Sequence, residues 1–390
     1  MKSTETKNQP LEKMRTADSG LAARWVLIGG FLGSGKTTAA SKFANYLQSK
    51  SLRVGVITND HGQALVDATT LRSQGLEAEE LEGGCFCRQT SRFAEIADNL
   101  ITEAGLHVLV AEPAGTCGDV GSTISYPLPG TTDKPLISAP LSVLVDPIRA
   151  SRIFGLDGGP RFSDKILRVY RKQLEDADFI VINKIDLISE PKLETLSNVL
   201  KKNHPSAQIF HVSARTGEGL PEWFDCIMSR ERKSRDRAHT DDELLAQGEA
   251  MLGWLNCSVH LSSVKYWESS GVLMELATTI QNILRAEGGE LAQLKMAFTP
   301  DEDMDAIAAL SLVRTDSAPE ISHKLPEPAQ SGELLLNLRA EADPELLHAA
   351  VNRALLILVD QHPQLFARLE HCEHFRPGKA RQPETVGHLD

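Results

Sequence analysis

The chain has 390 residues, of which 41% are hydrophobic and 24% charged, the composition of a soluble globular protein with material for two or three domains. Its formal net charge of −12 argues against nucleic acid or an anionic membrane as a partner, because both would repel it. No apolar run reaches the roughly eighteen residues of a membrane-spanning helix, and six cysteines are too few for a disulfide framework, so we expect a cytoplasmic protein.

The first predicted strand and helix flank a glycine-rich loop. Residues 1–20 are polar, lack the apolar core of a signal peptide, and are expected to be disordered. An apolar run at residues 25–28 predicts a strand, and residues 37–49 predict a helix. Between them the chain reads Gly-x-x-x-x-Gly-Lys-Thr, the pattern of a phosphate-binding loop. The residues expected to bind the nucleotide are Gly30, Gly33, Ser34, Gly35, Lys36, Thr37 and Thr38.

The residue types of this loop suit a triphosphate. Glycines let several backbone N–H groups come close to the phosphate oxygens. Lys36 would reach the β- and γ-phosphates, and the Thr37 hydroxyl would bind magnesium. The loop therefore predicts a site for a magnesium-bound nucleotide.

Further apolar runs alternate with helix-like segments up to about residue 228. They lie at residues 54–58, 107–111, 141–145, 179–183 and 208–212. Continuous runs of Val, Ile and Leu separated by helices are typical of a parallel sheet covered on both faces. We predict a doubly wound α/β domain over residues 21–229, with ligands at the carboxyl ends of its strands.

Acidic side chains follow several of these predicted strands. Asp60, in Asn59-Asp60-His61-Gly62, could hold a magnesium-bound or attacking water, although this sequence is equally typical of a turn. Glu112 follows the strand at 107–111, and nearby Gly115 could sense the γ-phosphate through its N–H. We expect Lys36, Asp60 and Glu112 to be catalytic. Asp146 is placed similarly, with a weaker signal.

The motif Asn183-Lys184-Ile185-Asp186 follows the most hydrophobic strand. The carboxylate of Asp186 can accept hydrogen bonds from N1–H and the 2-amino group of guanine, which adenine cannot donate. Asn183 can contact N7 and O6, and the stem of Lys184 can cover the ring. Ser213 and Ala214, after the last strand, would support the base, so this part of the chain predicts GTP specificity.

The last third of the chain predicts a second, smaller domain. Residues 230–250 carry mixed charge without apolar periodicity and are interpreted as a linker. Strand-like and helical segments over residues 251–362 follow the order β-α-β-β-α-β, which favours an α+β, ferredoxin-like fold. Residues 363–390 are interpreted as a partly ordered polar tail, although its segment His371-Cys372-Glu373-His374 could share a metal ion.

The motifs of the first domain resemble, in order, those of the CobW/UreG/HypB group of SIMIBI-class P-loop GTPases, and CobW-like metallochaperones most of all. They are the phosphate loop, Asn59-Asp60-x-Gly62, Leu81-Glu82-Gly83-Gly84-Cys85-Phe86-Cys87, Glu112-Pro113-Ala114-Gly115, Gln173-Leu174-Glu175-Asp176-Ala177-Asp178 and Asn183-Lys184-Ile185-Asp186. The resemblance covers residues 24–228. It implies GTP and magnesium as ligands, slow hydrolysis of GTP as a switch, and delivery of a metal or metal cofactor to a client enzyme.

A transition-metal site would depend on Cys85 and Cys87. CobW-like proteins typically carry Cys-x-Cys-Cys, whereas Arg88 stands at the third thiol position here. Two thiolates do not complete a tetrahedral zinc or cobalt site, but Cys117 and His61 follow strands that end at the same sheet edge and could complete it. The alternatives are a buried or redox-active cysteine pair, or a direct contact with a client or cofactor.

Two functions therefore remain open from the sequence. The first is a GTP-switched metallochaperone or cofactor-insertion factor for a client metalloenzyme, with a homodimer also allowed. The second is a GTP-dependent regulatory or assembly module that binds its client through the C-terminal domain and has no metal site. A P-loop kinase is less favoured, because no phosphoacceptor site is visible.

Overall fold

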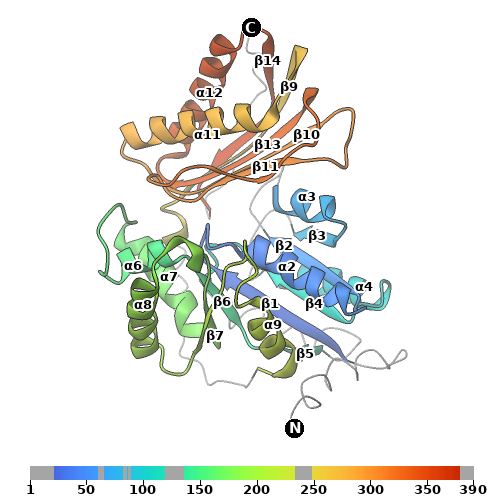
Figure 1. Ribbon diagram of the computed structural model, residues 1–390, viewed down its shortest axis with the longest axis vertical. Helices are drawn as coiled ribbons and strands as arrows, with labels where there is room; N and C mark the ends of the chain where they lie inside the picture. The colour runs from blue at the N-terminus through green and yellow to red at the C-terminus, as the bar shows by residue number, and fades with distance from the viewer. Residues whose placement is uncertain are drawn as a thin grey trace. The chain divides into compact units, whose positions relative to one another are not determined.

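The computed structural model describes residues 22–59, 66–81, 86, 89–118, 136–232 and 248–377. These residues divide into two compact units, coloured along the chain in Figure 1. Unit 1 comprises the described residues among Met1–Asp60, Leu76–Gly159 and Val169–Thr240, and unit 2 those among His61–Gly75, Pro160–Arg168 and Asp241–Asp390. No helix in the described part of the chain is both long and apolar enough to span a membrane.

Unit 1 is built on a parallel sheet with the strand order β3-β2-β4-β1-β6-β7-β8, and β5 also pairs with β1. The strands are β1 (Ala23–Gly30), β2 (Val54–Asn59), β3 (Glu77–Leu81), β4 (Val108–Glu112), β5 (Leu136–Ser138), β6 (Ser142–Val145), β7 (Phe179–Ile182) and β8 (Gln208–His211). The early strands lie on one side of β1 and the later ones on the other. This order confirms the predicted doubly wound α/β domain.

Two strands of this sheet, β5 and β3, were not predicted, and β3 is the longer of them. Its sequence Glu-Ala-Glu-Glu-Leu buries only Ala78 and Leu81, and it pairs with β2 alone at the end of the sheet. An edge strand needs few apolar residues because much of it faces solvent. The long apolar runs that mark the central strands are therefore missing here.

The helices of unit 1 connect these strands. They are α2 (Lys36–Ser49), α4 (Thr90–Thr102), α6 (Pro147–Ile153), α7 (Asp164–Asp176), η3 (Ile185–Leu187), α8 (Glu190–Asn203) and α9 (Leu220–Ser229). The first five residues of α7, 164–168, are grouped with unit 2. Helix α2 shows why such segments are helical. Its buried residues Ala40, Phe43, Ala44 and Leu47 recur every three or four positions, so they form one apolar face.

Unit 2 contains an antiparallel sheet with the strand order β12-β11-β10-β13-β9-β14. Its elements are β9 (Gly253–Trp267), α11 (Ser269–Ala286), β10 (Glu290–Pro300), β11 (Ala308–Leu312), β12 (Glu320–His323), β13 (Ala329–Glu341), α12 (Pro344–Gln361) and β14 (Leu365–Phe375). The order β10-β13-β9-β14 with two helices is the ferredoxin-like arrangement, extended by β11 and β12. Helices α11 and α12 contact each other and pack against this sheet (Figure 1).

The expected polar tail does not begin at residue 363. Residues Leu365–Phe375 form strand β14, which pairs along its length with β9. Leu365 and Phe375 are buried at its two ends. Charged residues and histidines alternate with apolar ones between them, so a search for apolar runs missed this strand.

A helix from the first half of the chain also belongs to unit 2. Helix α3 (Val66–Ser73) packs on the C-terminal sheet, where the backbone N–H of Val66 donates to Asn337 Oδ1 at 3.0 Å. Asp67 forms an ion pair with Lys295, and the side chain of Val66 joins a buried cluster of Ala297, Ile307 and Ala309. The C-terminal domain therefore includes a segment that the sequence assigned to the first domain.

Candidate nucleotide-binding site

The phosphate-binding loop lies between β1 and α2, as its pattern predicts. Gly30, Gly33 and Gly35 all have positive φ angles, of 133°, 74° and 93°. A Cβ atom on Gly35 would lie 2.4 Å from Asn183 Nδ2, and one on Gly30 would lie 2.4 Å from the carbonyl oxygen of Leu144. Both positions therefore require glycine. Gly35 is the N-cap residue of α2 and has no side chain that could cap the helix. An anion at the positive end of the helix could take the place of such a cap.

The residues expected to bind phosphate and magnesium lie together at the start of α2 and the end of β4. Thr37 Oγ1 donates to Glu112 Oε1 at 2.9 Å, and Lys36 Nζ lies 3.9 Å from the same oxygen. Lys36 and Glu112 are buried, so their charges are shielded from water and offset each other. The hydroxyl and carboxylate oxygens are of the type that magnesium prefers.

The turn after β4 packs against the phosphate-binding loop. A Cβ atom on Gly115 would lie 2.8 Å from the backbone nitrogen of Leu32, so the two backbones are in close contact. Gln173 of α7 is buried and donates to the carbonyl oxygens of Gly115 and Cys117, at 3.0 and 2.9 Å. Gln173 thus fixes the turn that carries Gly115, the residue predicted to sense the γ-phosphate. The sequence marked Gln173 only as part of a family motif and assigned it no role.

The motif predicted to read the base, residues 183–186, is bonded directly to the phosphate-binding loop and is called the base-reading motif below. Asn183 Nδ2 donates to the carbonyl oxygen of Ser34 at 2.9 Å. Asn183 Oδ1 accepts from the backbone N–H groups of Lys184 and Ala214, at 2.8 and 2.9 Å. Lys184 has a positive φ of 57°, and its ammonium donates to the carbonyl oxygen of Gly33. The structure therefore joins three stretches that lie far apart in the sequence.

The carboxylate expected to read guanine is held from two sides. Ser213 Oγ donates to Asp186 Oδ1 at 2.6 Å, and Arg215 Nη1 lies 3.8 Å from Asp186 Oδ2. The side chain of Asp186 remains 20% exposed to solvent. A base can therefore reach this carboxylate while Ser213 fixes its orientation.

Both carboxylate oxygens of Asp146 are bonded to other groups of the protein. Its Oδ1 accepts from the backbone N–H groups of Ile148 and Arg149, which caps the start of α6. Its Oδ2 forms an ion pair with Lys184 Nζ at 2.9 Å. Asp146 thus positions the lysine of the base-reading motif, a role that its place at the end of a strand did not reveal.

Asn59 links the carboxyl end of β2 to the segment that carries the cysteine pair. Its Nδ2 donates to the carbonyl oxygen of Leu81, and its Oδ1 accepts from the backbone N–H of Phe86 at 3.1 Å. Phe86 is fully buried against Phe93, with ring centroids 4.3 Å apart. The predicted site residues Asp60, His61, Cys85 and Cys87, together with Arg88, lie outside the described residues. Cys117 is described, and its side chain is buried.

Comparison with known proteins finds a family of nucleotide-binding domains that matches much of the first half of the chain. The family described as "CobW/HypB/UreG, nucleotide-binding domain" matches residues 24–211, just under half of the chain. The chain is 27% identical over 188 residues to the zinc chaperone YeiR of Escherichia coli (strain K12), covering 47% of this chain and 53% of that protein. It is 23% identical over 212 residues to the zinc-regulated GTPase metalloprotein activator 1 of Dictyostelium discoideum, covering 47% and 44%.

Other relatives are shorter or more distant. Urease accessory protein UreG of Trichodesmium erythraeum is 28% identical over 218 residues, covering 52% of this chain and 90% of that protein. Among solved structures, the Zn(II)-bound YjiA GTPase of E. coli covers 86% of this chain and 99% of its own, at 15% identity and a TM-score of 0.36. The matched regions span about half the length of the first two curated relatives above.

Proposed function

Because residues 24–211 match the CobW/HypB/UreG family of nucleotide-binding domains, we propose that this chain is a GTP-hydrolysing switch that delivers a metal or metal cofactor to a client enzyme. The proposal has a nucleotide half and a metal half. Different observations support each half, and different measurements test them.

The nucleotide half rests on one observation, the bonding of the base-reading motif to the phosphate-binding loop. Asn183 spans from Ser34 to Ala214, so a nucleotide with its phosphates on the loop would bring its base to Asp186. The carboxylate of Asp186 offers two acceptor oxygens for the N1–H and 2-amino donors of guanine. Adenine lacks these two donors, so the carboxylate would form no hydrogen bond with that base, which favours GTP over ATP.

Hydrolysis would use the charged cluster at the end of β4. Lys36 would stabilise the negative charge of the β- and γ-phosphates, and Thr37 and Glu112 would hold magnesium. Asp60 is proposed to orient the attacking water. Gly115, in contact with the phosphate-binding loop, would respond to loss of the γ-phosphate, which makes hydrolysis a switch.

The metal half rests on residue chemistry and on the names of relatives. Cys85 and Cys87 flank Phe86, whose N–H is anchored at the carboxyl end of β2 by Asn59. Thiolates there would suit zinc or cobalt, with Cys117 and His61 as proposed further ligands. Two relatives are named zinc chaperones and one a urease accessory protein, which supports a client metalloenzyme. A GTP-dependent assembly module without a metal site is the second candidate, favoured by Arg88 at the third thiol position.

The nucleotide half is tested with Asp186→Asn. Losing a charge-assisted pair of hydrogen bonds, at about 1.5–3 kcal/mol each, should weaken GTP binding roughly a hundredfold or more, and the amide should improve binding of xanthosine triphosphate. Isothermal titration calorimetry with excess magnesium measures both affinities. Glu222→Gln, an exposed carboxylate on α9, is the matched control and should bind GTP normally. Unchanged GTP affinity in Asp186→Asn would refute guanine recognition by this carboxylate.

The metal half is tested by titrating zinc in two nucleotide states. The wild-type chain should bind zinc with different affinities in GDP and in a non-hydrolysable GTP analogue, because the proposed ligand Cys117 is two residues from Gly115, the proposed γ-phosphate sensor. The double variant Cys85→Ser, Cys87→Ser should lose that nucleotide dependence, whereas Cys226→Ser on α9 should keep it. Equal zinc affinities in both states of the wild type would favour the assembly module.

A further inference from the structure

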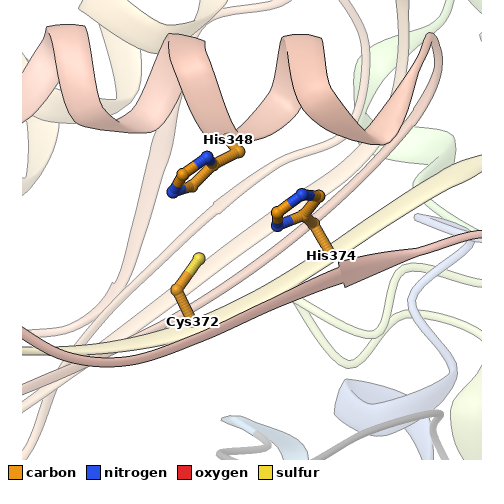
Figure 2. Close-up of side chains that lie close together, drawn as sticks. All are labelled: His348, Cys372 and His374. Carbon is orange, nitrogen blue, oxygen red and sulfur yellow. The ribbon is translucent and has the colours of Figure 1, made fainter. Parts of the chain in front are cut away.

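Three side chains able to bind a metal meet on one face of the sheet in unit 2. His348 comes from α12, and Cys372 and His374 come from the facing strand β14 (Figure 2). One ligand atom from each of them lies within 4.8 Å of the other two. Among the described residues this is the one such group of three His, Cys, Asp or Glu side chains.

Strand geometry selects these residues from the C-terminal cluster His371-Cys372-Glu373-His374. Cys372 and His374 are two residues apart, so they share a face of the strand. Their partners on β9, Cys257 and Leu255, are buried in the core that α11 and α12 help to form. Glu373 belongs to the opposite face, where it accepts a hydrogen bond from Asn256 at 3.0 Å.

The two imidazole rings are already oriented by neighbours on α12. Glu345 Oε1 lies 3.2 Å from His374 Nε2, and the side-chain amide of Asn352 lies 2.9 Å from His348 Nε2. When the Asn352 amide flips, its oxygen accepts a hydrogen bond from that ring nitrogen. Polar partners of this kind commonly orient metal-bound histidines, with the metal on the other ring nitrogen.

From this arrangement we propose that His348, Cys372 and His374 bind a zinc ion through two imidazole nitrogens and one thiolate. The Cys372 thiol releases its proton to solvent when the ion binds. Zinc bonds of about 2.0–2.3 Å place tetrahedral ligands roughly 3.3–3.6 Å apart, so the three atoms, now within 4.8 Å of one another, must draw closer to bind one ion. The fourth position is left for water or for a ligand from a partner, as in zinc sites that exchange ligands.

Zinc binding requires one ring to turn. The rings of His348 and His374 are stacked, with centroids 4.7 Å apart and an angle of 8° between their planes. A metal ion lies near the plane of each imidazole that binds it, and two parallel planes do not meet. At least one ring therefore rotates, and its contact with Glu345 or Asn352 changes as the ion enters.

Cys257 makes the site sensitive to oxidation. It lies directly opposite Cys372 on β9, and the two thiols are hydrogen-bonded. A disulfide between them would remove the thiolate that the zinc ion needs. Binding is therefore measured with a phosphine reductant present.

The test uses the full chain carrying Cys85→Ser and Cys87→Ser, which removes the other proposed thiolate ligands. Cobalt(II), used as a spectroscopic probe, should bind at one ion per chain, give a thiolate-to-metal charge-transfer band, and be displaced by zinc. The band should disappear in Cys372→Ser, and His348→Gln and His374→Gln should each weaken binding at least tenfold. His371→Ala, in the same strand, is the matched control and should bind normally.

Two outcomes would overturn the proposal. One is a chain that gives no charge-transfer band, and the other is a band that survives Cys372→Ser. If Cys372→Ser fails to fold by circular dichroism, His348→Gln on α12 decides, because retained affinity there also refutes the site. The inference does not rest on the proposed function: affinity here should be equal in GDP and in a GTP analogue, so either can fail while the other stands.

Discussion

Asp146 lies at the carboxyl end of β6, where a magnesium-binding carboxylate could be expected, yet its oxygens bond to the protein. One oxygen caps α6, and the other pairs with Lys184, whose stem is expected to cover the base. With only 3% of its side chain exposed, Asp146 fixes the position of Lys184 from inside the protein. A single residue thus links the start of a helix to the base-reading motif.

The variant Asp146→Asn separates these two roles. Asparagine caps helices about as well as aspartate, so α6 should be unaffected, but the attraction for Lys184 is lost. We expect GTP affinity to fall about tenfold, the size of one charged hydrogen bond, with an unchanged dependence on magnesium. Calorimetry at several magnesium concentrations measures this. Asp157→Asn, which breaks an exposed ion pair with Lys192, is the control, and an altered magnesium dependence in Asp146→Asn would instead make Asp146 a metal ligand.

At the scale of elements, helix α3 is encoded between two strands of unit 1 but packs within unit 2. Val66 contributes an apolar side chain to a cluster with β10 and β11 residues, and Asp67 and Gln74 bond to Lys295 and His323. Eight residues form too short a helix to be stable alone. Its stability therefore comes from the C-terminal sheet.

Removing residues 241–390 should leave α3 without this support. Exposing the side chain of Val66 costs about 1.5–3 kcal/mol, and its backbone and ion-pair partners are lost as well. We expect the shortened chain to unfold at a lower temperature than the full chain and to aggregate, measured by scanning calorimetry and light scattering. Val66→Ser in the shortened chain should reduce aggregation. A monomeric shortened chain as stable as the full one would show that α3 does not need the sheet.

At the scale of the whole molecule, two short segments, residues 66–75 and 160–168, belong to unit 2 although unit 1 residues precede and follow each of them in the sequence. A single boundary near residue 230 was the natural expectation, because that is where the composition changes. The sequence shows no such change of composition at either of the two segments. Each segment belongs to unit 2 because its side chains are packed there, which only the tertiary structure shows.

The sequence alone determined the phosphate-binding loop, the parallel sheet, the family resemblance and the α+β class of the C-terminal domain. These follow from local patterns, because glycine spacing and apolar runs report the conformation and burial of a short stretch directly. The tertiary structure decided the contact of Asn183 with Ser34, the support of Gly115 by Gln173, and the meeting of His348 with Cys372 and His374. Each joins side chains from different elements, and their proximity depends on strand order and helix docking, which no local pattern contains.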